Sequence, residues 1–170
     1  YLAMELLDGE SLARILEREG RLAWPSACSV LLQICESLAE AHACGVVHRD
    51  LKPENIMLVK GSRQGDFVKV LDFGLAKVSG VSDPYAVESQ RDVIGTPHFM
   101  SPEQILSGTV DHRADLYALG AVAFRMLTGR HIFADLRSTF EVLSAHVSKP
   151  AQTVAEAAPE AGVPEAISQI

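Results

Sequence analysis

Cysteine and positive charge are both scarce in this chain of 170 residues. Its three cysteines, Cys28, Cys35 and Cys44, are an odd set without the paired spacing of a zinc site or the density of a secreted disulfide framework. Lys and Arg number 15 against 22 Asp and Glu, giving a formal net charge of −7, and no basic block occurs. These features argue against a disulfide scaffold, disfavour a nucleic-acid partner and indicate a reducing compartment.

Long hydrophobic runs are also absent. The longest uncharged apolar run, residues 116–124, is far shorter than the roughly 20 residues that span a bilayer. The first residues lack the basic start of a signal peptide. We therefore expect no membrane segment in this chain and a cytoplasmic location, whereas a membrane anchor elsewhere in a parent protein stays open.

The remaining composition is that of one globular domain, with 48% apolar and 22% charged residues. Residue 1 is Tyr rather than Met, and residues 164–170 resemble the beginning of a helix. We therefore expect a fragment that is truncated at both ends.

Hydrophobic periodicity predicts several helices and one small β-hairpin. Helices are expected over residues 10–19, 25–45, 111–128 and 137–146, strands over 46–47, 56–59 and 67–71, and a long loop over 72–103. In the second helix, a stripe of Cys28, Leu31, Cys35 and Leu38 is expected to face the core. The helix that ends at residue 128 is apolar almost all round, which predicts central burial, so Asp115 near its start needs a hydrogen-bond partner.

Polar motifs gather in and around the predicted hairpin and loop. The run His48-Arg49-Asp50-Leu51-Lys52-Pro53-Glu54-Asn55 lies between strand-like pieces, and Asp72-Phe73-Gly74 follows the next strand. Gly95-Thr96-Pro97 and Ser101-Pro102-Glu103 come later. In this order and spacing, the chain resembles the protein kinase family.

The resemblance covers nearly the whole chain and implies an α+β, mainly α fold. Residues 1–12 would be the hinge and residues 13–170 the large lobe, with a small β-hairpin. By the same resemblance we expect the small lobe to be absent from this chain, because its sequence contains no glycine-rich phosphate loop and no strand lysine ahead of the expected hinge. We expect this piece alone to have negligible phosphoryl transfer.

The resemblance also implies the chemistry of the site. Asp50 would accept the proton of the substrate hydroxyl or orient that hydroxyl, and Lys52 would point toward the γ-phosphate of ATP. Asn55 and Asp72 would hold Mg²⁺ or Mn²⁺, which favour oxygen ligands. Lys52 and Thr96 resemble the serine/threonine branch, and the string from Gly95 to Glu103 resembles bacterial members.

Other residues receive supporting roles by the same resemblance. The backbone of Glu5 and Leu7 would bind adenine beside a gatekeeper, Met4, and Met57 would lie beneath the ring. His48 would be structural rather than a proton carrier, and Arg49 would pair with phosphate on an activation loop that contains Ser79, Ser82 and Ser89. Asp115 would hold the backbone of the catalytic loop, and Glu103 would pair with an arginine beyond Ile170. The further histidines, at 42, 98, 112, 131 and 146, lack metal spacing and are expected in surface or packing roles.

The sequence therefore predicts a transferase in signalling, a serine/threonine-protein kinase that moves the γ-phosphate of ATP to Ser or Thr of protein substrates. A pseudokinase or scaffold, which binds partners without transfer, is the alternative. The presence of Asp50, Lys52, Asn55 and Asp72 argues against it, but the decisive lysine would lie in the missing small lobe.

Overall fold

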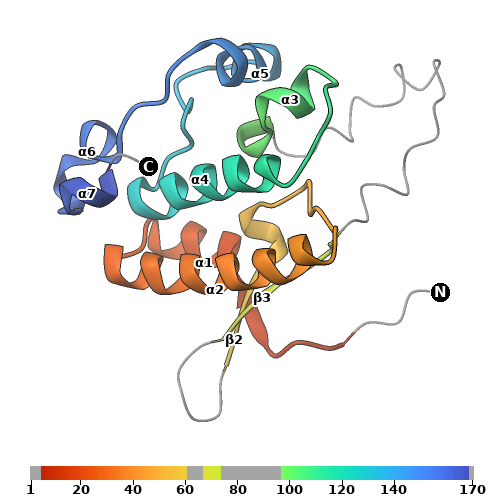
Figure 1. The fold of residues 1–170 in the computed structure, drawn as a ribbon. Coiled ribbons are helices and arrows are strands. Elements are labelled where there is room, and N and C mark those ends of the chain that lie inside the picture. The colour runs from red at the N-terminus through yellow and green to blue at the C-terminus, as the bar shows by residue number, and fades with distance from the viewer. Residues whose placement is uncertain (1–4, 61–66, 74–96, 169–170) are drawn as a thin grey trace.

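The computed structural model describes residues 5–60, 67–73 and 97–168, which form a mainly helical chain with one three-stranded sheet (Figure 1). The helices α1 and α2 lie on one side of α4, and α3 and α5 lie on the other side (Figure 1). The helices are α1 (Leu12–Glu19), α2 (Trp24–Ala43), α3 (Pro102–Ile105), α4 (Arg113–Thr128), α5 (Thr139–Ser148), α6 (Val154–Ala157) and α7 (Glu165–Ser168). Short 3-10 turns occur at η1 (Pro53–Asn55), η4 (Pro97–Phe99) and η5 (Pro159–Ala161).

The sheet is antiparallel, in the order β1-β2-β3. The predicted hairpin is present as β2 (Ile56–Val59) and β3 (Phe67–Val70), with Ile56 opposite Val70. The sequence did not predict β1 (Gly9–Ser11), which pairs with β2. Gly9 is required there, because a Cβ at this position would lie 2.3 Å from the carbonyl oxygen of Leu58.

The strand predicted over residues 46–47 is wrong. The Val46 amide donates to the Ala41 carbonyl, so this residue completes the turn that ends α2. Slightly further along, the amides of His48 and Arg49 donate to the Asp115 carboxylate. The backbone here therefore bonds to α2 and α4 instead of pairing with a strand.

Helix α2 was predicted correctly, but its buried face is rotated from the predicted stripe. The buried side chains of the helix are Ala27, Val30, Ile34 and Leu38. Cys28 is half-buried and Cys35 is exposed, so the prediction that both cysteines lie in the core is wrong for Cys35. Two apolar residues at almost every turn let either neighbouring face serve as the core stripe, and packing against α4 decides between them.

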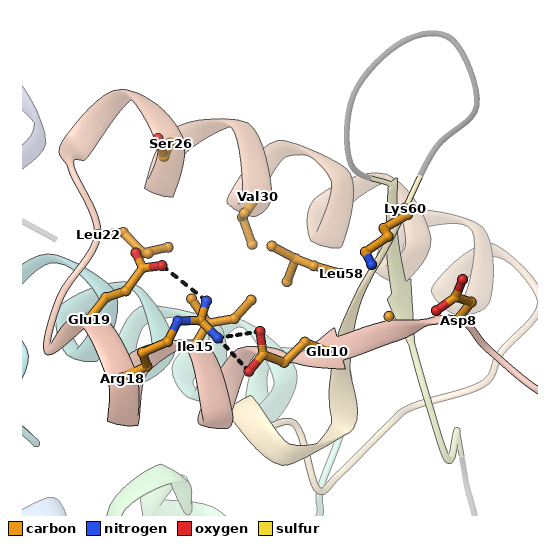
Figure 2. A pocket seen from close by; sticks show the side chains of 11 residues that line it. Asp8, Glu10, Ile15, Arg18, Glu19, Leu22, Ser26, Val30, Leu58 and Lys60 are labelled. Carbon is orange, nitrogen blue, oxygen red and sulfur yellow. Dashed lines mark hydrogen bonds and ion pairs between the residues drawn. The ribbon is translucent and has the colours of Figure 1, made fainter.

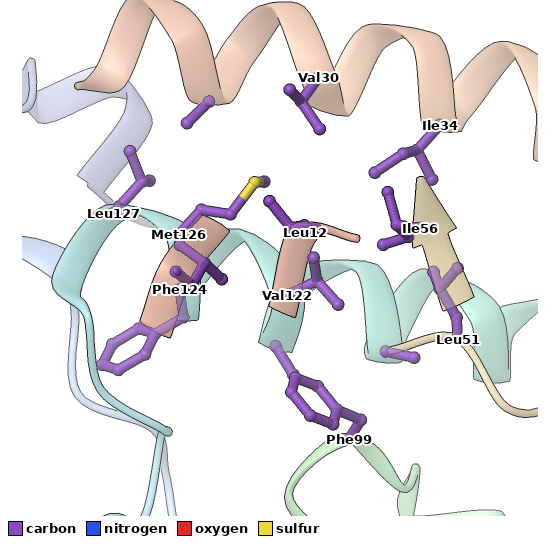
Figure 3. Packing of buried hydrophobic residues seen from close by; sticks show 14 of the residues in the cluster. Leu12, Val30, Ile34, Leu51, Ile56, Phe99, Val122, Phe124, Met126 and Leu127 are labelled. Carbon is purple, nitrogen blue, oxygen red and sulfur yellow. The ribbon is translucent and has the colours of Figure 1, made fainter. Parts of the chain in front are cut away.

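Helix α4 supplies the centre of the core. Its buried residues include Val122, Met126 and Leu127, which pack with Leu12 of α1 and Ile34 of α2 (Figure 3). The predicted burial on all sides fails most clearly near its start, where Leu116 is 52% exposed. Helix α4 is thereby packed on several sides, so its first turn provides a rigid attachment for a neighbouring loop.

Helices also occur where loops or connectors were expected. The predicted loop 72–103 contains η4 and the beginning of α3, and residues 147–164, where no helix was predicted, contain α6 and η5. None of the helices in the described residues is long and apolar enough to cross a membrane.

Candidate active site

One carboxylate in the first turn of α4, that of Asp115, holds the loop of residues 48–55 by hydrogen bonds. Asp115 is fully buried, and its Oδ2 accepts hydrogen bonds from the backbone N–H of His48 at 2.8 Å and lies 2.7 Å from Nε2 of His42. Its Oδ1 accepts from the backbone N–H of Arg49 at 2.8 Å. A buried carboxylate is costly unless such donors surround it, so these bonds explain how an acid is tolerated at this depth.

His48 uses both ring nitrogens inside the fold. Nδ1 accepts from the backbone N–H of Asp50 at 3.2 Å, so the proton resides on Nε2, which donates to the Leu71 carbonyl at 2.7 Å. The ring is fully buried and lies edge-on to Phe73, with ring centroids 4.9 Å apart. Neither nitrogen has room to exchange a proton with a substrate, so His48 joins the loop to the end of β3.

Arg49 adopts a left-handed backbone conformation with φ of 68°, which L side chains rarely adopt. Its carbonyl oxygen accepts from the side-chain Nε2 of Gln104 at 2.7 Å. Within the part of the chain that the structure describes, no group accepts a hydrogen bond from its buried Nε. The backbone of Arg49 is therefore held at its N–H by Asp115 and at its carbonyl by Gln104.

Asp50, Lys52 and Asn55 converge at the open side of this loop. Nζ of Lys52 lies 2.9 Å from Oδ2 of Asp50, and these side chains are 19% and 45% exposed. Asn55 donates from Nδ2 to the Asp50 carbonyl at 2.8 Å and to Asp50 Oδ2 at 3.2 Å. Because the amide nitrogen of Asn55 is used inside the loop, its side-chain oxygen remains as the acceptor for a ligand.

Asp72 is brought to the same place by the hairpin. The backbone N–H of Leu71 donates to the Asn55 carbonyl at 2.8 Å, and His48 holds the Leu71 carbonyl. Asp72 follows at once with φ of 63° and an exposed carboxylate. The end of β3 is therefore joined to the loop by two hydrogen bonds, and Asp72 is the residue that directly follows this junction.

The donors fit a hard cation bound together with phosphate. The Asn55 carboxamide oxygen and the Asp72 carboxylate are the oxygen ligands that Mg²⁺ favours, and Mg²⁺ is commonly held by one or two carboxylates plus substrate phosphates. In the described residues no cluster of three or more His, Cys, Asp or Glu could hold a metal ion. The arrangement suits a metal that arrives with a nucleotide better than a permanent protein cage.

The residues expected at the adenine pocket are only partly described. Glu5 is exposed, and its carboxylate pairs with Nζ of Lys69 on β3. Leu7 and Met57 are half-buried, whereas Ile56, the neighbour of Met57 on the opposite face of β2, is fully buried. Met4, Thr96, Ser79, Ser82 and Ser89 lie outside the described residues.

Glu103 lies in the first turn of α3, and its negative charge acts on Tyr117 of α4. Burial, and secondarily this charge, raise the pKa of the Tyr117 hydroxyl. That hydroxyl lies 2.6 Å from Nδ1 of His146 on α5. Glu103 therefore belongs to the contact region of α3, α4 and α5 rather than to the site around Asp50.

Three histidines expected in packing roles lie near η4, with His146 buried and His98 and His131 half-buried. The rings of His98 and His131 are stacked with centroids 4.0 Å apart, and His146 packs edge-on to Phe133. Burial, and then the charge of neighbouring groups, lower the pKa of both His131 and His146 to about 4. The cluster is therefore neutral at ordinary pH.

A cavity of about 410 Å³ lies elsewhere, between β1, β2, α1 and α2 (Figure 2). Arg18 crosses it and bonds both carboxylate oxygens of Glu10 at 2.6 Å and Glu19 at 3.1 Å. The Arg18 guanidinium lowers the pKa of Glu10. Neither Asp50 nor the other three polar residues of the site, Lys52, Asn55 and Asp72, line this cavity, so it is separate from the candidate active site.

Comparison with known proteins decides the family. The model of the family described as protein kinase domain matches residues 1–168. This chain belongs to the protein kinase family. The serine/threonine-protein kinase Pkn1 of Myxococcus xanthus is 50% identical over 135 residues, which cover 79% of this chain and 19% of that protein. A probable serine/threonine-protein kinase PknB of Bifidobacterium longum is 39% identical over 165 residues, covering 97% of this chain and 23% of that protein.

The family resemblance drawn from the sequence is thus confirmed, including its bacterial serine/threonine character. This piece of the kinase domain covers about a fifth of the length of these two curated relatives.

Sequence reasoning missed two residues that support the loop of the kinase domain. His42 contacts Asp115, but it lies in a helix 73 residues earlier, and nothing in its spacing signals the contact. Gln104 stands three residues after Ser101, a spacing typical of a helix-start capping box. That signal predicts the contact with Ser101 but not the second contact, to Arg49.

Proposed function

We propose that this chain is the large-lobe part of a serine/threonine protein kinase that transfers the γ-phosphate of ATP to Ser or Thr hydroxyls of protein substrates. The observation that carries the proposal is the convergence of Asp50, Lys52 and Asn55 on the loop beside Asp72. Membership in the family and the printed names of the relatives support the same activity.

In this proposal Asp50 receives or orients the hydroxyl of the substrate. Its carboxylate is part-exposed, so an incoming hydroxyl can reach it. Lys52 is already within ion-pair distance of that carboxylate, so its ammonium lies where it can offset negative charge on the phosphate as the hydroxyl approaches. Asp50 and Lys52 therefore form one unit of base and cation.

Asn55 and Asp72 are the residues that would hold Mg²⁺ or Mn²⁺ with the nucleotide. When bound, the metal would supply positive charge against the phosphates of ATP. The chain itself contributes the fixed spacing of the two oxygen donors, because the backbones around both residues are joined by the bond between Leu71 and Asn55. Glu5, Leu7 and Met57 would contact the adenine end, Thr96 the substrate, and Arg49 phosphate on the activation loop.

The test is phosphoryl transfer by the full-length protein that contains this chain, with radiolabelled ATP and a generic protein substrate. Asp50→Asn removes the proposed base, and Asp72→Asn weakens the proposed metal ligand. Each should reduce kcat by at least about 100-fold, the usual range for loss of a positioned acid–base group. Asp135→Asn is the matched control, because the Asp135 side chain is exposed and pairs with Arg130 at the surface.

Wild-type protein that binds ATP without transfer, or Asp50→Asn with undiminished kcat, would contradict the proposal. The first result would favour the pseudokinase, since binding would then be preserved without chemistry. Analysis of the phosphorylated residues in the product tests the restriction to Ser and Thr.

A further inference from the structure

Gln104 connects the start of α3 with the loop of residues 48–55, to which the proposed function assigns different roles. It lies at the third position of α3, just after the Ser101-Pro102-Glu103 triplet that ends the predicted loop. Its Oε1 accepts from the backbone N–H and the hydroxyl of Ser101, both at 3.1 Å. Its Nε2 donates across 55 residues of sequence to the carbonyl of Arg49 at 2.7 Å. One side chain therefore ties the start of α3 to the catalytic loop.

The carbonyl that Gln104 holds belongs to the peptide unit directly before Asp50. The N–H of the same peptide unit donates to Nδ1 of His48 at 3.2 Å. A peptide unit is planar, so bonds at its oxygen and at its hydrogen fix the rotation of the whole plane. That rotation sets the direction from which the Asp50 side chain leaves the backbone.

Fixing this plane matters because the neighbouring backbone is strained. Arg49 has φ of 68°, a conformation that costs of the order of 1–3 kcal/mol for a residue with a side chain and persists only where surroundings enforce it. Asp115 enforces it at the Arg49 N–H, and Gln104 is the partner at the Arg49 carbonyl. Without Gln104, the plane between Arg49 and Asp50 is held only through its N–H.

We infer that Gln104 is a positioning residue for phosphoryl transfer. It holds the peptide plane before Asp50, so the orientation of the Asp50 side chain depends on the position of segment 101–104. The inference rests on the proposed function. It assigns Gln104 no contact with substrate, nucleotide or metal. Its action goes through the Arg49 carbonyl alone.

The chain contains a matched control for the local role of Gln104 in starting a helix. Glu141 occupies the same position of α5, where its Oε2 accepts from the Ser138 N–H at 3.1 Å and from the Ser138 hydroxyl at 2.9 Å. Within the described residues, Glu141 forms no hydrogen bond to the loop 48–55. Glu141→Ala therefore removes a capping box without touching the catalytic loop.

The experiment measures kcat and KM of the full-length protein for ATP and a protein substrate, with thermal melting to verify folding. Gln104→Met keeps length and removes the hydrogen bonds of the side chain. It should lower kcat about 10- to 100-fold, the scale of a displaced catalytic group, with KM for ATP changed less than about 3-fold. Glu141→Ala should leave kcat within about 2-fold. Equal kcat values for these two variants, or a loss confined to KM, would overturn the inference.

Gln104→Glu adds a signature that a capping role does not predict. An ionised carboxylate can still accept hydrogen bonds from Ser101. It cannot donate to the Arg49 carbonyl, and instead places a second acceptor oxygen opposite it. At pH 7 to 8 a glutamate is ionised, so this variant should keep the contacts with Ser101 and still lose kcat about as much as Gln104→Met does. A kcat equal to that of wild type would contradict a role through the Arg49 carbonyl.

Amide hydrogen exchange separates this inference from the proposed function. Faster exchange of peptides covering residues 48–52 in Gln104→Met than in Glu141→Ala is expected whether or not the wild type transfers phosphate. An inactive wild type would overturn the proposed function alone. Unchanged exchange in Gln104→Met would overturn the inference about Gln104 alone.

Discussion

Asp115→Asn is expected to be among the most destabilising isosteric substitutions in this chain. The carboxylate is fully buried and is bonded to the N–H groups of His48 and Arg49 and to the ring of His42. Asn has one acceptor oxygen, so its amide nitrogen must face at least one N–H donor. One backbone donor then loses its partner, and the bonds that remain lose their charge.

The magnitude follows from these three bonds. A hydrogen bond to a charged group contributes about 1.5–3 kcal/mol, and an orphaned buried donor costs about 1–3 kcal/mol. Because bonds that share one acceptor are not additive, we expect about 3 kcal/mol for Asp115→Asn and about 4–5 kcal/mol for Asp115→Ala. These values are a large part of the 5–15 kcal/mol that usually stabilises a domain.

The assay is urea unfolding followed by far-UV circular dichroism, with Asp135→Asn as the control. The Asp135 side chain is 83% exposed and its pair with Arg130 lies at the surface, so this control should change the free energy of unfolding by less than about 0.5 kcal/mol. An Asp115→Asn protein within about 1 kcal/mol of wild type would refute the view that this carboxylate suspends the loop.

Two further predictions concern the histidines His131 and His146 and the choice of the face of α2 that packs in the core. Because the pKa values of His131 and His146 lie at about 4 in the fold against 6.5 when unfolded, the unfolded chain takes up protons first as pH falls below 6.5. Urea unfolding at pH 5 should therefore show a loss of about 1 kcal/mol per histidine relative to pH 7, less than the full shift would give because solvent screens these partly exposed groups, and a His131→Gln/His146→Gln double variant should lose correspondingly less; equal losses would refute the assignment. Ile34→Ala should lower the free energy of unfolding by about 3 kcal/mol and Cys35→Ala by less than about 1 kcal/mol, as derived from urea unfolding midpoints. The reverse order would show that the face containing Cys35 packs in the core, as the sequence predicted.

Elements with a strong local signal were predictable from the sequence. Two short apolar segments, 56–59 and 67–71, on either side of a polar stretch predicted the hairpin, and in the structure its register sets Ile56 opposite Val70. That pairing already implies that Asn55 and Leu71 lie side by side, so the approach of Asp72 to the loop follows from a local prediction. The chemistry assigned to the site came instead from the family resemblance carried by its motifs, and the roles of Asp50, Lys52, Asn55 and Asp72 stay predictions.

Features that depend on contacts between distant segments were not predictable. Strand β1 consists of Gly9, Glu10 and Ser11, which have little preference for a strand and become one only by pairing with β2. The apolar pattern around Cys35 fits two neighbouring helix faces, and only the position of α4 selects one. The bond from Gln104 to Arg49 has the same character, since the capping spacing predicts its first contact and says nothing of the second.

The backbone strain beside the site is likewise invisible in the sequence, and it bears on how the site works. Arg49 and Asp72 both have positive φ, where glycine would be less strained. Glycine at either position would relax the backbone but delete the guanidinium or the carboxylate that the proposed chemistry needs. The strain at Arg49 is sustained by the bonds to Asp115 and Gln104, which both come from outside the loop. The geometry of Asp50 therefore depends on α4 and α3 being in place, so a change in the segment that leads into α3 can reach the proposed base without touching it.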